Sequence, residues 1–287
     1  MPMEGKLVLI TGGNSGIGKA AAVDLAKLGA DLVLLCRNRD KADAAKDDIV
    51  SASGRQVDII IADLLLQKEV RRAASEFLET HSKLDVLINN AGANFVTHSE
   101  TEDGIERTMA LNYFAPFLLT NLLVSTLRKS APSRIVNVSS VAHYEGSLDL
   151  SNLRKGGMGL GGLGAYGRSK LALNLFTYEL ARRLQGSGVT ANCLHPGAVR
   201  TNIWSHASVF TPFTMLASLF MLSPEKGAKT SVYLASSPEV EGITGKYFEK
   251  CAPKRSSRES YDEAEAAQLW ELSMRITGLA TQSTMGR

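Results

Sequence analysis

Short runs of β-branched and aliphatic residues alternate along this chain with longer stretches of helical periodicity, and this alternation limits the possible folds more than any other feature. Strands are expected at residues 7–11, 31–36, 57–61, 86–89, 134–139, 190–194 and 246–248. Most of them are continuously apolar, as strands are when helices cover both faces of a parallel sheet. Helices are expected at residues 18–28, 41–52, 68–81, 101–129, 166–184, 224–236 and 260–277. This order predicts an α/β fold, a single doubly wound domain with a mostly parallel seven-stranded sheet.

The length of 287 residues leaves one large or two small domains open, at about 150 residues per domain. No internal repeat or Pro-rich linker divides the sequence, so we expect one domain over residues 1–278 and a C-terminal tail at 279–287. A formal net charge of +3 is too small to indicate a nucleic-acid partner. The three cysteines form no CxxC pair, and no long apolar segment precedes the first strand. Both features favour a cytoplasmic protein without disulfides.

Glycines cluster at the turn after the first expected strand. Residues 11–18 have the sequence TGGNSGIG, with glycine at positions 12, 16 and 18, where a helix begins. Glycine at such positions lets the backbone approach a pyrophosphate, whose charge is favoured by the N-terminus of the helix. A tight turn without a ligand is the alternative. The strand before the turn and the helix after it favour a dinucleotide site.

The residue after the second expected strand bears on the choice of cofactor. That strand ends at Cys36, and Arg37 follows it. An acidic residue here would bind the ribose 2′-hydroxyl of NAD, whereas an arginine offers a charge-assisted contact to the 2′-phosphate of NADP. A solvated surface charge is the alternative. The sequence therefore predicts NADP rather than NAD.

Further motifs narrow the interpretation. NNAG at residues 89–92 follows the fourth expected strand, and YGRSK at 166–170 begins a helix. With the glycine turn, LNY at 111–113, NVSS at 137–140 and PG at 196–197, they resemble the short-chain dehydrogenase/reductase family. Several shorter segments resemble the retinol dehydrogenase-like branch of this family. They are AH at 142–143, HPG at 195–197, GKYF at 245–248 and LWELS at 269–273.

The resemblance implies a Rossmann-type domain and an NADP-dependent short-chain dehydrogenase/reductase. Hydride would pass between NADPH and the carbonyl of an apolar, retinal-like aldehyde or ketone. The implied catalytic residues are Asn112, Ser140, Tyr166 and Lys170. Asn112 would hold a water on a proton path from Lys170, Ser140 would donate to the substrate oxygen, and Tyr166 would be the general acid or base.

The spacing of Tyr166 and Lys170 supports this assignment from the residues themselves. Four positions apart on a helix, the two side chains share one face. An ammonium beside a phenol favours the phenolate, so we expect Lys170 to lower the pKa of Tyr166.

The expected cofactor contacts run from the glycine turn to the segment after the sixth strand. They are Gly12, Asn14, Ser15, Gly16, Ile17, Gly18, Arg37, Asp63, Leu64, Asn90, Ala91, Gly92, Tyr166, Lys170, Pro196, Gly197, Val199 and Thr201. The resemblance implies that Asp63 and Leu64 meet the adenine, that Asn90 to Gly92 line the adenosine ribose, and that Pro196, Gly197, Val199 and Thr201 hold the nicotinamide end. No metal is expected, because the five histidines show no HxxxH or HExxH spacing.

Two segments are expected on the substrate side. Residues 156–164 hold six glycines among nine and are predicted to form an ordering lid, with a surface insertion without function as the alternative. Residues 207–224 carry no charge and are predicted to cover an apolar substrate. Contact of 209–222 with a membrane surface or a partner, or core packing, are the alternatives. His143 is a further candidate for substrate contact.

Several functions remain open at this point. The same chemistry on a sterol, lipid, xenobiotic or polar carbonyl is one alternative, and a catalytically silent NADPH-sensing or scaffold protein is another. The resemblance also implies a homodimer or homotetramer through the helices expected at 101–129 and 166–184.

Overall fold

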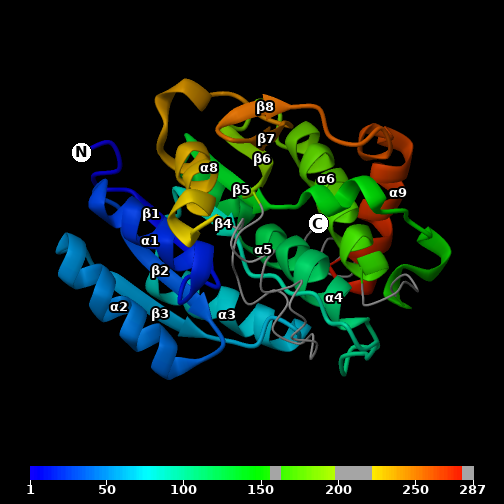
Figure 1. Cartoon of the computed structure of the whole chain (residues 1–287), viewed down its shortest axis with the longest axis horizontal. Coiled ribbons are helices and arrows are strands. Elements are labelled where there is room, and N and C mark those ends of the chain that lie inside the picture. The colour runs from blue at the N-terminus through cyan, green and yellow to red at the C-terminus, as the bar shows by residue number, and fades with distance from the viewer. Residues whose placement is uncertain (156–162, 198–221, 280–287) are drawn as a thin grey trace, which may run out of the picture.

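The structure is a computed structural model that describes residues 1–155, 163–197 and 222–279 (Figure 1). An eight-stranded sheet lies at its centre, in the order β3-β2-β1-β4-β5-β6-β7-β8. The strands are β1 (Leu7–Thr11), β2 (Asp31–Cys36), β3 (Val57–Ile61), β4 (Val86–Asn89), β5 (Ser133–Val138), β6 (Val189–His195), β7 (Tyr247–Glu249) and β8 (Ala252–Lys254). Neighbouring strands are parallel except for β7 and β8. The predicted α/β class and doubly wound arrangement are confirmed.

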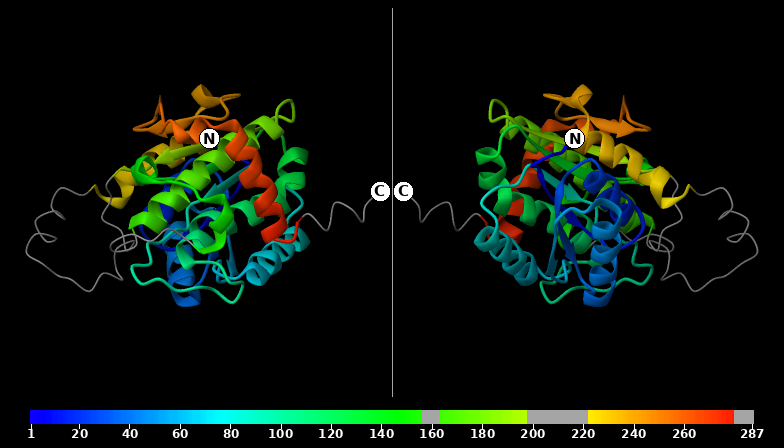
Figure 2. Two further views of the ribbon diagram at one scale, coloured as in Figure 1. Left: turned by 90° about the vertical axis from the view of Figure 1, so that its right-hand side faces the viewer. Right: turned by 90° about the vertical axis from the view of Figure 1, so that its left-hand side faces the viewer.

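Helices cover both faces of this sheet. They are α1 (Gly16–Lys27), α2 (Arg39–Ser53), α3 (Gln67–Thr80), α4 (Arg107–Met109), α5 (Ala115–Lys129), α6 (Leu163–Arg183), α8 (Pro224–Ser236) and α9 (Glu263–Ile276). A π-helical turn, η1 (Ala110–Phe114), joins α4 to α5, and the short helices are η2 (Val141–Glu145), η3 (Leu150–Lys155), η6 (Pro238–Val240) and η7 (Glu259–Tyr261). One face carries α1, α2 and α8, and the other carries α3, α5, α6 and α9. Figure 2 shows α6 and α9 in front in its left view and α1 and α2 in front in its right view.

Successive residues of each central strand pack under different helical layers. In β1, Val8 and Ile10 join the apolar cluster of α1, α2 and α8, whereas Leu7 and Leu9 join that of α3, α5, α6 and α9. Side chains along a strand point alternately to opposite faces, so a sheet covered on both sides needs continuously apolar strands. The strands β1 to β4 accordingly have the bounds expected from the sequence.

The sheet has eight strands rather than the seven expected. The additional strand β8 pairs antiparallel with β7 across a turn at Lys250 and Cys251, whose φ angles are 52° and 62°. Positive φ is uncommon outside glycine, and Pro253 is a residue that strands admit only at an edge. The residues of β8 are exposed. No apolar alternation or turn signal therefore marks this strand in the sequence.

The long helix expected at 101–129 begins later than predicted. Gly104 lies in a turn with a φ of 66°, and the Glu106 carboxylate accepts hydrogen bonds from two backbone N–H groups of the next turn. The helical stretch therefore begins after Glu106, where these N–H groups are capped. The final helix α9 likewise begins later than the expected residue 260, after Asp262, whose carboxylate caps its first turn.

The strand order reverses at β1, which lies between β2 and β4. The Thr11 hydroxyl, at the end of β1, accepts hydrogen bonds of 2.9 Å from the backbone N–H groups of Asn90 and Ala91 after β4. The carboxyl ends of the two strands are thereby held together. In open α/β sheets, ligands bind at this reversal point.

One helical stretch of the described residues, Arg107–Lys129, is long and apolar enough to cross a membrane. Of the most apolar 18-residue segment within it, 72% is buried inside the fold. Phe117 and Leu118 within it belong to the core beneath α3, α6 and α9. Burial in the core accounts for the apolar character of this stretch.

Candidate active site

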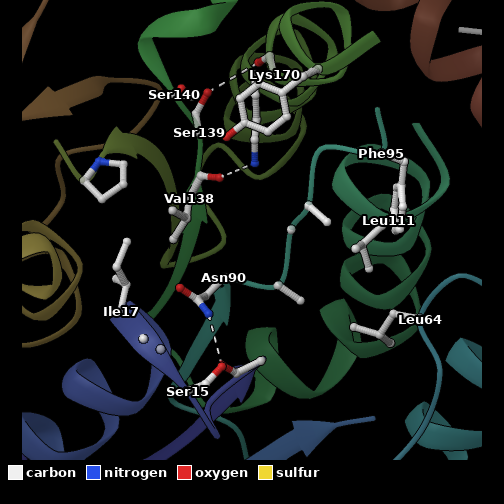
Figure 3. Close-up of a pocket in the computed structure, with 18 of the residues that line it drawn as sticks. Ser15, Ile17, Leu64, Asn90, Phe95, Leu111, Val138, Ser139, Ser140 and Lys170 are labelled. Atoms are coloured by element: carbon white, nitrogen blue, oxygen red, sulfur yellow. Dashed lines mark hydrogen bonds between the residues drawn. The ribbon is translucent and has the colours of Figure 1, made fainter. Parts of the chain in front are cut away.

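A cavity of about 1430 Å³ runs along the carboxyl ends of the central strands (Figure 3). Every described residue that was expected to contact the cofactor lines it: Gly12, Asn14, Ser15, Gly16, Ile17, Gly18, Arg37, Asp63, Leu64, Asn90, Ala91, Gly92, Tyr166, Lys170, Pro196 and Gly197. The expected contacts Val199 and Thr201 lie outside the described residues, as do 156–162 of the glycine-rich segment, 207–221 of the apolar segment and 280–287 of the tail.

The glycine turn is packed so closely that side chains would not fit. Gly12 has a φ of 67°, and a Cβ on Gly18 would lie 2.4 Å from the Asn90 amide nitrogen and 2.4 Å from the Gly12 carbonyl oxygen. Ser15 precedes α1 without a side-chain cap, and no acidic residue lies in the first turn. The N–H groups at the start of α1 are thus available to an anion in the cavity.

Cationic side chains line the cavity beyond the end of β2. Arg37 lies there with its Nη1 atom 4.0 Å from the Asp63 carboxylate. Lys41 lines the same region, and no motif in the sequence marks it as a cofactor contact. Asn38 caps α2 by accepting from the Lys41 backbone N–H at 2.8 Å, which places Lys41 on the first turn facing this end of the cavity.

Lys170 and Tyr166 lie together at the other end of the cavity. The Lys170 ammonium donates to the Val138 carbonyl at 2.9 Å (Figure 3). It also lies 5.6 Å from the centre of the Tyr166 ring. Burial lowers the pKa of Lys170 to about 8. Burial raises the pKa of Tyr166, and a hydrogen bond with the Ser140 side chain opposes that rise. The expectation that Lys170 lowers the pKa of Tyr166 is wrong for this arrangement, because burial disfavours the charged form of both groups.

Ser140 caps the short helix η2 and lies two residues after the end of β5. Its hydroxyl oxygen accepts a hydrogen bond of 3.2 Å from the Ala142 backbone N–H. A hydroxyl has one proton and two lone pairs, so the Ser140 proton stays available for a donor contact. The Ser140 hydroxyl forms a hydrogen bond with the Tyr166 side chain.

Asn112 lies behind the cavity, within the π-helical turn η1. Its amide oxygen accepts from the Ala93 N–H at 2.9 Å, and its amide nitrogen donates at 3.0 Å to the Ala93 carbonyl and to Ser169. Single π-helical turns occur often at functional sites. The Asn112 side chain therefore joins the segment after β4 to α6, whereas its expected water contact stays a prediction.

His143 does not line the cavity, contrary to its proposed substrate contact. Its side chain is fully buried, and both ring nitrogens are hydrogen-bonded within the protein, to Ser140 and to Ser257. Among the described residues, no group of three or more His, Cys, Asp or Glu side chains is placed to hold a metal ion.

Several apolar side chains on the substrate side were not individually predicted. The cavity is also lined by Phe95, Leu111, Val141, Tyr144 and Leu163. Val141, Tyr144 and Leu163 are among the most exposed large apolar residues described. In the sequence they look like ordinary apolar positions, because the segments that carry them meet only in the fold.

Comparison with known proteins identifies the family. The chain matches the family model of short chain dehydrogenases over residues 6–209. It is 43% identical to retinol dehydrogenase 13 of Homo sapiens over 288 aligned positions, which cover 98% of this chain and 87% of that protein.

Solved structures agree with this match. A crystal structure of an uncharacterized protein from Mycobacterium paratuberculosis is 33% identical, with a TM-score of 0.77 and coverage of 96% of this chain and 94% of that one. The Pseudomonas aeruginosa RhlG/NADP active-site complex is 29% identical, with a TM-score of 0.71 and coverage of 85% and 94%. The chain therefore belongs to the short-chain dehydrogenase/reductase family and is a retinol dehydrogenase-like oxidoreductase.

Proposed function

We propose that this oxidoreductase transfers hydride between NADPH and the carbonyl carbon of an apolar, retinal-like aldehyde or ketone. The main support is that Ser140, Tyr166 and Lys170 line the same cavity as the glycine turn and Arg37. A proton donor, an oxyanion contact and a dinucleotide cradle are thus brought to one space. Retention of all these groups favours an active enzyme over a silent NADPH-sensing or scaffold protein.

The residues of the cavity suit a dinucleotide phosphate. The glycine turn keeps the backbone N–H groups of α1 open to a pyrophosphate, because no Cβ or capping side chain intervenes. Arg37 and Lys41 supply cations for a ribose 2′-phosphate. When bound, NADPH supplies the hydride, and the protein supplies orientation and the proton.

Tyr166 and Ser140 act on the substrate oxygen. In reduction, the Ser140 hydroxyl donates a hydrogen bond to the carbonyl oxygen, and the Tyr166 hydroxyl transfers its proton there as negative charge develops. In oxidation, Tyr166 accepts the same proton from the alcohol. Because Lys170 has a pKa lowered to about 8 by burial, it can gain or lose a proton near neutral pH beside Tyr166.

Replacing Arg37 with Asp should change the cofactor preference. A charge-assisted contact contributes about 1.5–3 kcal/mol, so the Kd for NADPH should rise about 10- to 100-fold while that for NADH stays nearly constant. Titration of cofactor fluorescence measures both constants. Arg39→Asp is the matched control, because Arg39 lies two positions on, outside the cavity lining, and pairs with Asp43 at 3.8 Å. Equal losses of NADPH and NADH affinity in Arg37→Asp would refute the assignment.

The lining of the substrate side supports an apolar substrate. Val141 and Tyr144 lie on η2, which Ser140 caps, and Leu163 begins the helix that carries Tyr166. Their exposed fractions of 43%, 42% and 53% leave apolar surface in the cavity next to the proposed reaction centre. Apolar surface of this kind is typical of binding sites.

One observation favours a second substrate class, the polar or acidic carbonyls. The Arg107 guanidinium lines the cavity and lies 4.1 Å from the centre of the Phe95 ring. Within the described part of the chain, it forms no ion pair. A carboxylate on the substrate could supply the missing partner.

A panel of apolar aldehydes and carboxylate-bearing aldehydes separates the two classes. If the substrate is apolar, Arg107→Met should leave kcat/KM for apolar aldehydes within about twofold. If the substrate carries a carboxylate, kcat/KM for carboxylate-bearing aldehydes should fall about tenfold or more in Arg107→Met, because the charge-assisted contact between Arg107 and that carboxylate is lost. Higher kcat/KM for the carboxylate-bearing members in the wild type would reject the apolar assignment.

Location and assembly stay predictions. We expect a cytoplasmic enzyme that is a homodimer or homotetramer in solution. Contact of residues 209–222 with a membrane surface is the alternative to their predicted role as a substrate cover.

A further inference from the structure

His143 lies fully buried on the turn that carries Ser140. Its Nδ1 atom is 2.6 Å from the Ser140 carbonyl oxygen, and its Nε2 atom is 3.1 Å from the backbone nitrogen of Ser257. Ser257 is 114 positions further along the chain. The imidazole therefore joins the serine turn to the segment between β8 and η7.

The two contacts fix the protonation of the ring. A backbone N–H can only donate, so the Ser257 N–H requires an unprotonated Nε2 as acceptor. The remaining proton is then on Nδ1, where it is donated to the Ser140 carbonyl. Burial also lowers the pKa of His143, which favours the neutral ring. A neutral histidine with both nitrogens occupied is a rigid connector rather than a proton carrier.

The contact to Ser140 acts on the reacting hydroxyl through the backbone. The Ser140 carbonyl accepts from both the Nδ1 atom of His143 and its backbone N–H, the latter at 3.2 Å. These two contacts fix the orientation of the peptide group between Ser140 and Val141. The N–H of the following residue, Ala142, donates to the Ser140 hydroxyl oxygen. The direction of the hydroxyl proton depends on this turn.

The far end of the connector is anchored to the helix that carries Tyr166. The Ser256 hydroxyl lies 2.6 Å from the Tyr178 hydroxyl on α6 and 2.7 Å from the Ser260 hydroxyl. The His143 ring also packs on Tyr247, with the ring centres 4.9 Å apart. The segment that holds His143 is thus also bonded to α6, so this segment connects the turn of Ser140 with the helix of Tyr166.

We infer that His143 is a positioning residue that holds the Ser140 hydroxyl in line with Tyr166 by joining the serine turn to the segment at 255–260. The inference rests on the proposed function, because it assumes that Ser140 and Tyr166 act on one substrate oxygen. A small displacement of a reacting group can lower turnover strongly without changing cofactor binding.

Three substitutions separate the two ends of the connector. In His143→Asn the amide nitrogen takes the place of Nδ1, and in His143→Gln the amide oxygen takes the place of Nε2, whereas His143→Phe keeps neither. We expect kcat to fall about 10- to 100-fold in the Phe and Gln variants and to stay within about fivefold of the wild type in the Asn variant. The Kd for NADPH should stay within about twofold throughout, and His98→Asn, at an exposed histidine, should match the wild type.

The outcomes distinguish this inference from the proposed function. A Phe variant with wild-type kcat, or an Asn variant as slow as the Phe variant, would overturn the positioning role while leaving the proposed chemistry intact. A wild type that turns over no aldehyde with NADPH would overturn both. Nitrogen-15 NMR of the imidazole gives a readout independent of activity: the expected state has the proton on Nδ1, and a proton on Nε2 contradicts the connector.

Discussion

Tyr166→Phe should bind NADPH as the wild type does and lose about a thousandfold in kcat, the range expected for removal of a general acid or base. The Tyr166 side chain is 7% exposed, and the substitution removes only its hydroxyl. The ring keeps its packing and its position beside Lys170. The loss should therefore be confined to proton transfer to the substrate oxygen.

Stopped-flow measurement of NADPH oxidation with a good aldehyde substrate tests this result, with cofactor fluorescence as the binding readout. Tyr233→Phe is the matched control, because its hydroxyl donates to Glu239 outside the cavity, and its kcat should stay within about twofold. A Tyr166→Phe variant that retains kcat within about tenfold of the wild type would show that another group supplies the proton.

Gly18→Ala should weaken both the fold and cofactor binding. The new methyl group would lie 2.4 Å from the Asn90 amide nitrogen and 2.4 Å from the Gly12 carbonyl oxygen, so the turn has to move. Such overpacking costs about 1–3 kcal/mol of stability. The same displacement moves the N–H groups of α1 away from the pyrophosphate, and the Kd for NADPH should rise about tenfold or more.

Gly54→Ala is the control for this substitution. Gly54 has a φ of 68° at the end of α2, and a Cβ there meets no atom within 4 Å. This variant should lose about 1 kcal/mol of stability through backbone strain alone and keep its NADPH affinity. Chemical denaturation and fluorescence titration give the two quantities. An unchanged Kd in a folded Gly18→Ala protein would mean that this turn does not hold the cofactor.

Much of the fold is predictable from the sequence because the central strands are buried on both faces. Strands β1 and β2 are apolar almost throughout, and their bounds follow directly from that pattern. The edge strand β8 was missed because its exposed residues need no apolar side chains, and its turn uses Lys250 and Cys251 rather than glycine or asparagine.

The site divides in a similar way. Gly18 and Lys170 are recognisable because they lie in short motifs whose spacing carries the chemistry. The connection from His143 to Ser257 has no such signal, since it depends on two segments 114 positions apart meeting in space. The pKa of Tyr166 is raised rather than lowered for a related reason. The spacing of the two residues predicts that Lys170 lies near Tyr166, but it does not predict the burial of both side chains.

Transfer of a label from the cofactor tests the proposed reaction most directly. The wild-type protein is incubated with long-chain aldehydes, retinal among them, and with NADPH deuterated at the nicotinamide C4 on each face in turn. The account predicts an alcohol that carries one deuterium on the former carbonyl carbon with one of the two labelled cofactors and none with the other. NADPH that binds without yielding any labelled alcohol from the panel, with either label, would contradict it and favour a silent NADPH-binding protein.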